Sequence, residues 1–335
     1  MNTEEITDTT SVIKIPLNYG EINTETDMSP LDEIIGQEEV KKQLRFFIGS
    51  VSEKTPFPTL LLTGSKGLGK TYTSDKIAKC LGRKLVVFNC GSLKETGDFI
   101  EQVLVGQIRG EENVCLLMDE SHELSFEITN FLLSMLNPSN KDGKFVFRYN
   151  NIDVEYDMNR VNIIFATTDA YMMFSPLVNR CREIYFSSYS IEEIKSILDK
   201  YSDGIQITTK DPDLAHACRR RARNAFFWAQ DIIRHTNTSG KKVFDDKDWN
   251  DLKNVFGIFP LGLRSQEVRM LRVLENNSPI SLKNLAVTLG VNKKNIEDEI
   301  SLWPRELGFL ETGVRGSYIS EEGKKYLADH AVELV

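Results

Sequence analysis

The sequence has no long apolar run and few cysteines. No stretch approaches the roughly 20 uncharged apolar residues of a membrane-spanning helix, and the acidic, threonine-rich start does not resemble a secretory signal. The cysteines show neither C-x-x-C nor Cys/His ligand spacing, and several lie in apolar runs; they are Cys80, Cys90, Cys115, Cys181 and Cys218. We therefore expect a cytoplasmic protein with no membrane partner, whose cysteines are buried, reduced thiols rather than disulfides or metal ligands.

An excess of basic charge is also lacking. The 335 residues include 41 Lys and Arg against 49 Asp and Glu, which gives a formal net charge of -8. Affinity for a phosphate backbone comes mainly from Lys and Arg that displace counterions, so this balance excludes a surface that binds nucleic acid all over. Any contact with DNA must be local. The length and the hydrophobic content of 41% suffice for two or three domains with their own cores.

Apolar runs alternate with helix-like segments in the first half of the chain. Residues 1–27 are polar, and we expect a flexible tail there. The following pattern is typical of a parallel sheet flanked by helices, so the predicted fold class is α/β over residues 28–188. The strands of this sheet are expected at the apolar runs 59–62, 85–88, 114–118 and 161–166.

Strand signals disappear in the next part of the chain. Three helical patterns predict an all-helical domain over residues 189–258, at 191–201, 212–234 and 245–255. Three further helices are then followed by two short strands joined by a glycine-bearing turn, an order that predicts a winged helix over residues 259–335. Its helices are expected at 266–274, 281–290 and 293–307.

Residues 64–71 fit the phosphate-loop pattern G-x-x-x-x-G-K-[ST], between an apolar run and a helical segment. The glycines let backbone N–H groups turn toward a triphosphate, Lys70 can reach its β- and γ-phosphates, and the Thr71 hydroxyl can bind Mg²⁺. The alternative is a glycine-rich turn without a ligand. The predicted ATP-binding residues of this segment are Gly64, Ser65, Lys66, Gly67, Leu68, Gly69, Lys70, Thr71 and Tyr72.

Two later strand ends carry polar side chains suited to phosphoryl transfer. Asp119 and Glu120 follow a buried strand, and parallel strands deliver their last residues to one edge of the sheet. We expect Asp119 to hold Mg²⁺ through water and Glu120 to orient the attacking water. Thr168, which we choose over Thr167, follows the next strand and is the expected γ-phosphate sensor. The alternative is an ordinary strand end with a charged turn.

Two arginine sites complete the expected chemistry. Arg180 lies too far along the chain to serve its own site easily, but it can reach the site of a neighbouring subunit; a surface salt bridge is the alternative. The basic cluster 219–223 is read as the start of an amphipathic helix, where Arg223 can fold over the nucleotide. A solvated face or a nucleic-acid patch is the other interpretation. The apolar face of this helix is expected to include Phe226, Phe227, Ile232 and Ile233.

The predicted winged helix carries scattered basic residues among acidic ones. Arg315 at the tip of the wing and the pair Lys293 and Lys294 are the candidates for contact with DNA phosphates, together with Lys283 and Arg305. A motor that moves along any sequence needs contacts to the backbone rather than base readout. A winged helix used only for protein contacts is the alternative.

From about residue 30, this combination resembles the AAA+ ATPases and most closely the RuvB family of Holliday-junction branch-migration motors. The segment 31–40 is similar to the family's N-terminal segment beside the adenine and implies that Ile35 lines the nucleotide site. The run from Asp119 to His122 resembles its Asp-Glu-Ile-His box. Thr168 matches sensor 1, Arg180 the arginine finger and Arg223 the sensor-2 arginine.

The resemblance implies an ATP- and Mg²⁺-dependent enzyme that forms a hexameric ring. It would translocate the duplex arms of four-way junctions, with a RuvA-like protein as a possible partner. The chain departs from the family where two prolines are replaced by Ser65 and Lys66, where Arg220 and Arg221 replace a Gly-Thr pair, and in the hairpin expected over 144–156. A clamp-loader-like or initiator-like AAA+ ATPase of DNA replication and a nucleotide-controlled assembly switch are the alternative functions.

Overall fold

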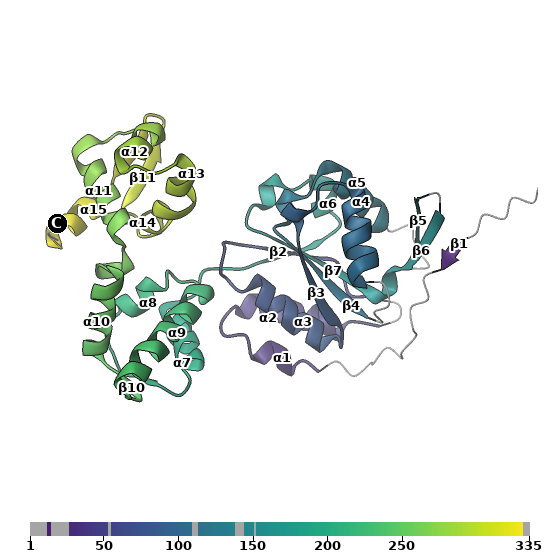
Figure 1. The fold of residues 1–335 in the computed structure, drawn as a ribbon, viewed down its shortest axis with the longest axis horizontal. Coiled ribbons are helices and arrows are strands. Elements are labelled where there is room, and N and C mark those ends of the chain that lie inside the picture. Colours follow the sequence, from purple (N-terminus) through teal and green to yellow (C-terminus); the bar gives the residue numbers. More distant parts are fainter. Residues whose placement is uncertain are drawn as a thin grey trace, which may run out of the picture. The chain divides into compact units, whose positions relative to one another are not determined.

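The computed structural model describes residues 12–14, 27–52, 55–108, 113–137, 144–150 and 152–330. The chain forms two compact units, Met1–Ser188 and Tyr189–Val335 (Figure 1). Within the described ranges, every helix is too short or too polar to span a bilayer. The tail expected over residues 1–27 lies outside the described residues, apart from Val12–Lys14 and Asp27.

A five-stranded parallel sheet in the order β3-β4-β7-β2-β8 forms the centre of the first unit. Its middle strands are apolar on both faces because helices cover both faces of a parallel sheet. The four strands predicted from apolar runs are confirmed, and β8 is added at the edge beside β2. The strands are β2 (Leu60–Thr63), β3 (Lys84–Asn89), β4 (Val114–Asp119), β7 (Val161–Thr167) and β8 (Arg182–Tyr185).

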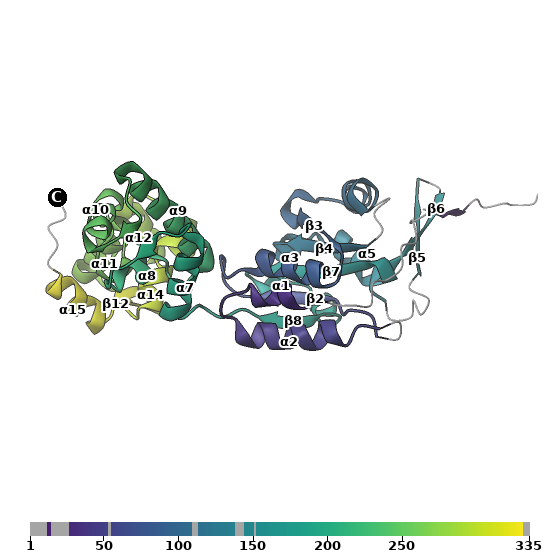
Figure 2. The same cartoon turned by 90° about the horizontal axis from the view of Figure 1, so that it is seen from below.

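Helices pack on the two faces of this sheet. The helices α2 (Glu38–Gly49) and α3 (Lys70–Cys80) lie on one side, and α3 contacts β3, β4 and β7 (Figures 1 and 2). On the other side, the π-helix η2 (Phe99–Ile108) and α5 (Phe126–Met135) pack their buried side chains on alternate residues of β4 and β7. The shorter helices of this unit are α1 (Ser29–Asp32), η1 (Cys90–Ser92), α4 (Thr96–Asp98), η3 (Ser121–Glu123), η4 (Met158–Arg160), η5 (Ala170–Met172) and α6 (Ser175–Val178).

The expected hairpin is present as β5 (Lys144–Tyr149) and β6 (Ile152–Asp157). Phe145 and Phe147 point into the core and contact Phe131 of α5, because alternate residues of a strand face the same side. A third strand, β1 (Val12–Lys14), pairs in parallel with the free edge of β6. Three residues of the polar tail therefore extend the hairpin into a three-stranded sheet.

The first part of the second unit is helical, with a two-residue pairing of β9 (Gln206–Ile207) and β10 (Val243–Phe244). The helix expected over 212–234 is divided, because Arg219 and Arg220 adopt left-handed backbone angles and α9 begins only after them. The prediction for its apolar face was partly wrong: Ile232 is buried, whereas Phe226 and Phe227 are exposed at 40% and 56%. The helices are α7 (Ile191–Tyr201), α8 (Asp213–Ala217), α9 (Ala222–Ser239) and α10 (Asp246–Phe256).

The second part is a winged helix, as predicted. Instead of the single helix expected over 293–307, α13 passes directly into the π-helix η7, and a new helix begins at Leu302. Pro304 has no N–H to donate and is tolerated in the first turn of that new helix. The wing is the antiparallel pair β11 (Leu310–Gly313) and β12 (Gly316–Ile319). The helices are η6 (Pro260–Gly262), α11 (Ser265–Asn277), α12 (Leu282–Leu289), α13 (Lys293–Asn295), η7 (Ile296–Ile300), α14 (Leu302–Glu306) and α15 (Glu321–Asp329).

Candidate nucleotide-binding site

Three neighbouring parallel strands end at the same edge of the sheet. Thr63, the last residue of β2, lies opposite Thr167, the last residue of β7. Met118 of β4 lies opposite Phe165 of β7, so that Asp119 is one residue from the same edge. The register therefore brings together the phosphate loop after β2, the carboxylates after β4 and the hydroxyls after β7.

The phosphate loop requires glycine for a steric reason. Gly64 has a φ of +138°, and a Cβ there would lie 2.6 Å from the carbonyl oxygen of Phe186. Gly67 and Gly69 also have positive φ, and Gly69 caps the N-terminus of α3 with a left-handed backbone. The loop therefore approaches β8 closely and joins a helix whose N–H groups favour an anion.

The side chains of the loop have the chemistry that a metal–triphosphate needs. The Lys70 ammonium donates to the carbonyl oxygens of Gly64 at 2.6 Å and Ser65 at 3.0 Å, which keeps it on the loop. Thr71 is exposed on the first turn of α3, and Ser65 and Lys66 are exposed as well. A phosphate-binding lysine next to a threonine hydroxyl fits the groups that hold ATP and Mg²⁺.

Glu120 has an unusual backbone beside these groups. Its φ of 52° and ψ of 47° are left-handed, a conformation that costs a residue with a side chain roughly 1–3 kcal/mol. The Glu120 N–H donates to Asp119 Oδ1 at 3.1 Å, which orients the neighbouring carboxylate. Both residues are partly exposed at the strand end, so that their oxygens remain accessible.

His122 and Thr167 form a contact to which the sequence assigned no role. The His122 Nδ1 and Thr167 Oγ1 atoms are 3.0 Å apart, and Thr167 Oγ1 also accepts from the Asp169 N–H at 2.9 Å. The carboxylate of Glu120 is 3.7 Å from His122 Nδ1. Thr168, the predicted sensor, is partly buried and donates to Asp169 Oδ2 at 2.6 Å. The structure therefore places both threonines at the strand end and connects Thr167 to the carboxylate side of the site.

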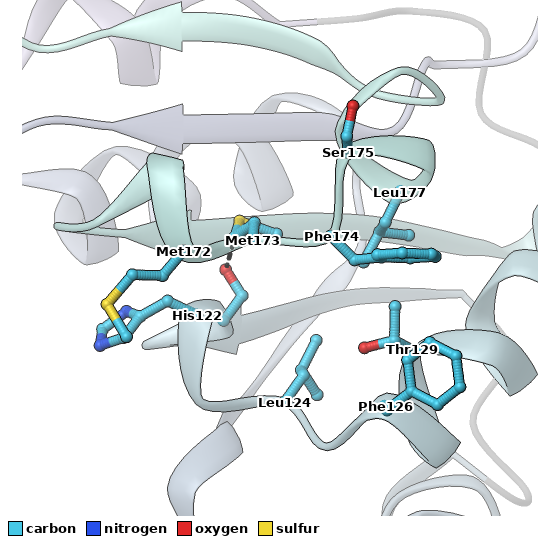
Figure 3. Close-up of a pocket in the computed structure, with 10 residues that line it drawn as sticks. His122, Leu124, Phe126, Thr129, Met172, Met173, Phe174, Ser175 and Leu177 are labelled. Carbon is cyan, nitrogen blue, oxygen red and sulfur yellow. Dashed lines mark hydrogen bonds between the residues drawn. The ribbon is translucent and has the colours of Figure 1, made fainter.

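A pocket of about 330 Å³ adjoins His122, between η3, α5 and the segment around Phe174 (Figure 3). Met172 lies against the His122 ring, and Ser121 Oγ contacts Met173 Sδ at 3.7 Å. The Phe126 and Phe174 rings meet edge to face at 5.6 Å, although they are 67% and 41% exposed. An apolar surface therefore extends outward from the carboxylate side of the site.

Arg180 lies on the segment that leads away from this pocket. It is exposed just after α6, and its Nη1 donates to the carbonyl oxygen of Pro176 at 3.2 Å. Within the described part of the chain, no carboxylate forms an ion pair with Arg180. The alternative interpretation of Arg180, as one half of a surface salt bridge, therefore lacks a partner carboxylate among the described residues.

The predicted adenine-side residue, Ile35, is partly buried in the turn between α1 and α2. The neighbouring Gln37 donates from Nε2 to the Ser187 carbonyl at 2.7 Å and accepts from the Ser187 N–H at 3.3 Å. These bonds fix the turn to the chain that follows β8. Tyr72, on the first turn of α3, is also partly exposed, with the Lys76 ammonium 4.8 Å from its ring centroid.

Several predicted residues lie in the second unit. Arg223 is exposed on the first turn of α9. Lys293 and Lys294 are exposed on α13, beside an acidic turn, and Arg315 is exposed at the wing tip. Gly316 has a φ of +132°, and a Cβ there would lie 2.2 Å from the Ile280 carbonyl oxygen, so that glycine fixes the shape of the wing.

The five cysteines are free, and all except Cys181 are fully buried. Burial raises the pKa of Cys80 to about 11 and the pKa values of Cys115 and Cys181 to about 12. Burial also raises the pKa of Cys90, next to the nucleotide-site carboxylates, and the charge of Asp119 adds to the effect. These thiols are therefore neutral packing groups, as predicted.

The chain is similar to RuvB proteins in sequence and in structure. Residues 28–185 match the family model of the Holliday junction DNA helicase RuvB P-loop domain, and residues 260–328 match the RuvB C-terminal winged helix domain. The Holliday junction branch migration complex subunit RuvB of Prochlorococcus marinus (strain MIT 9301) is 29% identical over 313 residues, which cover 89% of this chain and 86% of that protein. The corresponding subunit of Fervidobacterium nodosum is 26% identical over 306 residues, with 89% and 87% coverage.

The structural comparison extends over the same length. The structure of the Thermotoga maritima RuvB Holliday junction branch migration motor has a TM-score of 0.73 and 23% sequence identity, and it covers 89% of this chain and 96% of that one. At this identity the structural comparison establishes the fold, and the matches to the two RuvB domain models, which together cover most of the chain, establish the family. The chain therefore belongs to the RuvB-like proteins, with a P-loop domain and a C-terminal winged helix.

Proposed function

We propose that this chain is an ATP-driven DNA motor that translocates the duplex arms of four-way junctions and so drives their branch migration. The observation that carries the proposal is the register of β2, β4 and β7, which gathers the phosphate loop, Asp119 and Glu120 at one sheet edge. The RuvB relatives are named for branch migration and align along nearly their whole length. The cytoplasm is the proposed place of action, because its reducing conditions suit the buried free thiols.

In the proposed mechanism, Lys70 binds the β- and γ-phosphates, and the loop N–H groups hold the rest of the triphosphate. Thr71 and Asp119 would hold Mg²⁺, which neutralises charge on the phosphate oxygens when it is bound. Glu120 accepts a hydrogen bond from the attacking water and orients it toward the γ-phosphorus. Thr168 senses the γ-phosphate, and Ile35 lines the adenine side of the site.

The test is ATP-dependent dissociation of a synthetic four-way junction, compared with a linear duplex and with a primed single strand. The wild-type chain should dissociate the junction only with ATP and Mg²⁺, and Lys70→Ala should be inactive because the phosphates lose their cation. The outcome against the proposal is ATP turnover that responds to primed single strands but not to junctions. That result would favour the replication ATPase.

We also propose that the active form is a ring, specifically a hexamer, in which Arg180 completes the site of the next subunit. The exposed and mutually contacting apolar residues Phe126 and Phe174 support self-association, because a buried interface removes such side chains from water. Mixing Arg180→Ala with Lys70→Ala subunits should restore part of the ATP turnover, since some sites then combine an intact loop with an intact arginine. Absence of recovery at every mixing ratio would contradict the role of Arg180.

A RuvA-like protein is the proposed partner at the hairpin, and DNA is the proposed ligand of Arg315, Lys293 and Lys294. The outer face of the hairpin carries the ion pair between Lys144 and Glu155 at 3.2 Å, so that a partner there must match alternating charges. A pull-down of the added junction-binding protein with wild type and with Lys144→Glu tests this contact. Equal capture by both proteins would exclude the hairpin face as the docking site.

A further inference from the structure

The segment Arg219–Arg221 connects three parts of the second unit. The Arg220 Nε donates to the carbonyl oxygen of Tyr189 at 2.8 Å, and the Tyr189 N–H donates back to the Arg220 carbonyl at 3.1 Å. Tyr189 is the first residue of this unit. The left-handed backbone of Arg219 and Arg220, with φ of 55° and 53°, turns the chain so that successive arginines reach different neighbours.

Arg219 reaches into the winged helix. Its Nη2 lies 2.8 Å from Glu267 Oε1 and 2.9 Å from Glu267 Oε2, and the Arg264 N–H donates to the same carboxylate at 2.7 Å. The side chains of Arg219 and Glu267 are only 12% and 3% exposed. Such a buried pair adds little net stability over apolar packing of the same volume, but it is costly to break and therefore specifies one arrangement of the two parts.

Arg221 forms a second ion pair to the winged helix, from Nη2 to Glu306 Oε1 at 3.1 Å. A hydrogen bond adds to these two ion pairs: the Leu261 N–H, in the winged helix, donates to Asp213 Oδ1, in the helical part, at 2.8 Å. Trp303 donates from Nε1 to the Leu261 carbonyl at 2.8 Å. The helical part and the winged helix are thus joined by two ion pairs and by the hydrogen bond from Leu261 to Asp213, while Trp303 holds Leu261 to the rest of the winged helix.

We propose that Arg219 and Arg221 are positioning residues that fix the winged helix to the start of α9, so that DNA contact at the wing sets the position of Arg223. Arg223 is on the first turn of α9, two residues after Arg221. The proposal rests on the proposed function, in which the winged helix holds DNA, and on the role of nucleotide sensor that the sequence predicts for Arg223. By linkage, DNA then changes ATP affinity by the same factor by which ATP changes DNA affinity.

The Arg221–Glu306 pair is suited to a test because its side chains are 19% and 36% exposed and tolerate charge changes. The variants are Arg221→Glu, Glu306→Arg and the double charge swap. The matched control is Arg234→Glu, which breaks the Arg234–Asp231 pair within α9 and leaves the winged helix untouched. For each protein we would measure kcat and KM for ATP with and without a blunt duplex, and DNA affinity by fluorescence anisotropy with and without ATP.

In the wild type and in Arg234→Glu, DNA should change the KM for ATP by about fivefold or more, the lower end of typical coupling between sites. Both single variants at the 221–306 pair should lose this response to less than about twofold. The double swap should restore it, because the ion pair is rebuilt with reversed polarity. The same variants should exchange the amide hydrogens of residues 259–264 faster than the wild type, a readout that needs no activity.

Retention of the full DNA response in both single variants would overturn the inference, and so would unchanged hydrogen exchange at 259–264. A wild-type KM that DNA does not alter would also overturn it, while leaving the ATPase assignment intact. Absence of ATP turnover in the wild type would instead refute the proposed function. The two failures are therefore distinguishable.

Discussion

Gly262 is the position where adding one methyl group should be most informative about the second unit. Its φ is +71°, and a Cβ there would lie 2.5 Å from Ala217 N and from the His216 carbonyl carbon. Gly290 has almost the same φ, +73°, but a Cβ there would meet no atom within 4 Å. The two substitutions to alanine therefore share the backbone strain and differ in the clash.

The expected magnitudes follow from this difference. Left-handed alanine costs about 1–2 kcal/mol in both variants. At Gly262 the obstructing atoms are backbone and cannot rotate away, so that overpacking adds about 1–3 kcal/mol. For a unit of this size, about 3 °C of melting temperature corresponds to 1 kcal/mol, so Gly262→Ala should melt about 3–9 °C below Gly290→Ala.

Differential scanning calorimetry of the full chain measures both variants against the wild type. Urea unfolding followed by tryptophan fluorescence provides an independent measure, because Trp228, Trp249 and Trp303 are all buried in the second unit. Equal melting temperatures for the two variants would refute the argument that the chain at Gly262 is packed against α8. A lower melting temperature for Gly290→Ala would refute it more strongly.

Three further predictions concern single groups. Glu120→Gln should retain ATP binding and lower turnover by about 10²–10⁴-fold, measured by phosphate release and by binding of a fluorescent ATP analogue; unchanged turnover would contradict its role. Burial alone would raise the pKa of Asp248, but hydrogen bonds, first among them that from Lys241, lower this pKa to about 2. The contribution of Asp248 to the free energy of unfolding is therefore complete above about pH 4 and is lost as the pH falls toward 2. Asp248→Asn should make the free energy of unfolding, measured with urea, depend less on pH between pH 4 and pH 2, and an unchanged pH dependence would contradict the assignment. Burial raises the pKa of Cys115 to about 12, so iodoacetamide at pH 8 should leave it unmodified until urea is added, and rapid native labelling would count against its burial.

The sequence predicted those parts of the site whose residues lie close together along the chain. The glycines of the phosphate loop and Lys70 lie within eight residues, and Asp119 and Glu120 directly follow an apolar run, so that spacing alone indicates their position. The contact between His122 and Thr167 joins residues 45 positions apart. It depends on the register of β4 with β7, which the residue pattern does not specify.

Other features had weak or misleading sequence signals. Strand β8 buries Ile184 but exposes its other residues, so that it lacks the apolar run that marked the central strands. The residues of the basic cluster before α9 predict a helix start, because nothing in their side chains indicates two consecutive left-handed residues. Tertiary contacts with Tyr189 and Glu267 stabilise this backbone, and such contacts override local propensity.

The parallel pairing of β1 with β6 has a consequence for the order of events during synthesis. The two strands are separated by about 140 residues. At a synthesis rate of about 5–20 residues per second, roughly 7 to 28 s pass between the production of β1 and that of its partner. Among the strands that the structure describes, the first one made therefore waits longest for its partner. During this interval on the ribosome, β1 is available to the strand edges of neighbouring nascent chains, and the β6 edge becomes available to them as soon as it emerges.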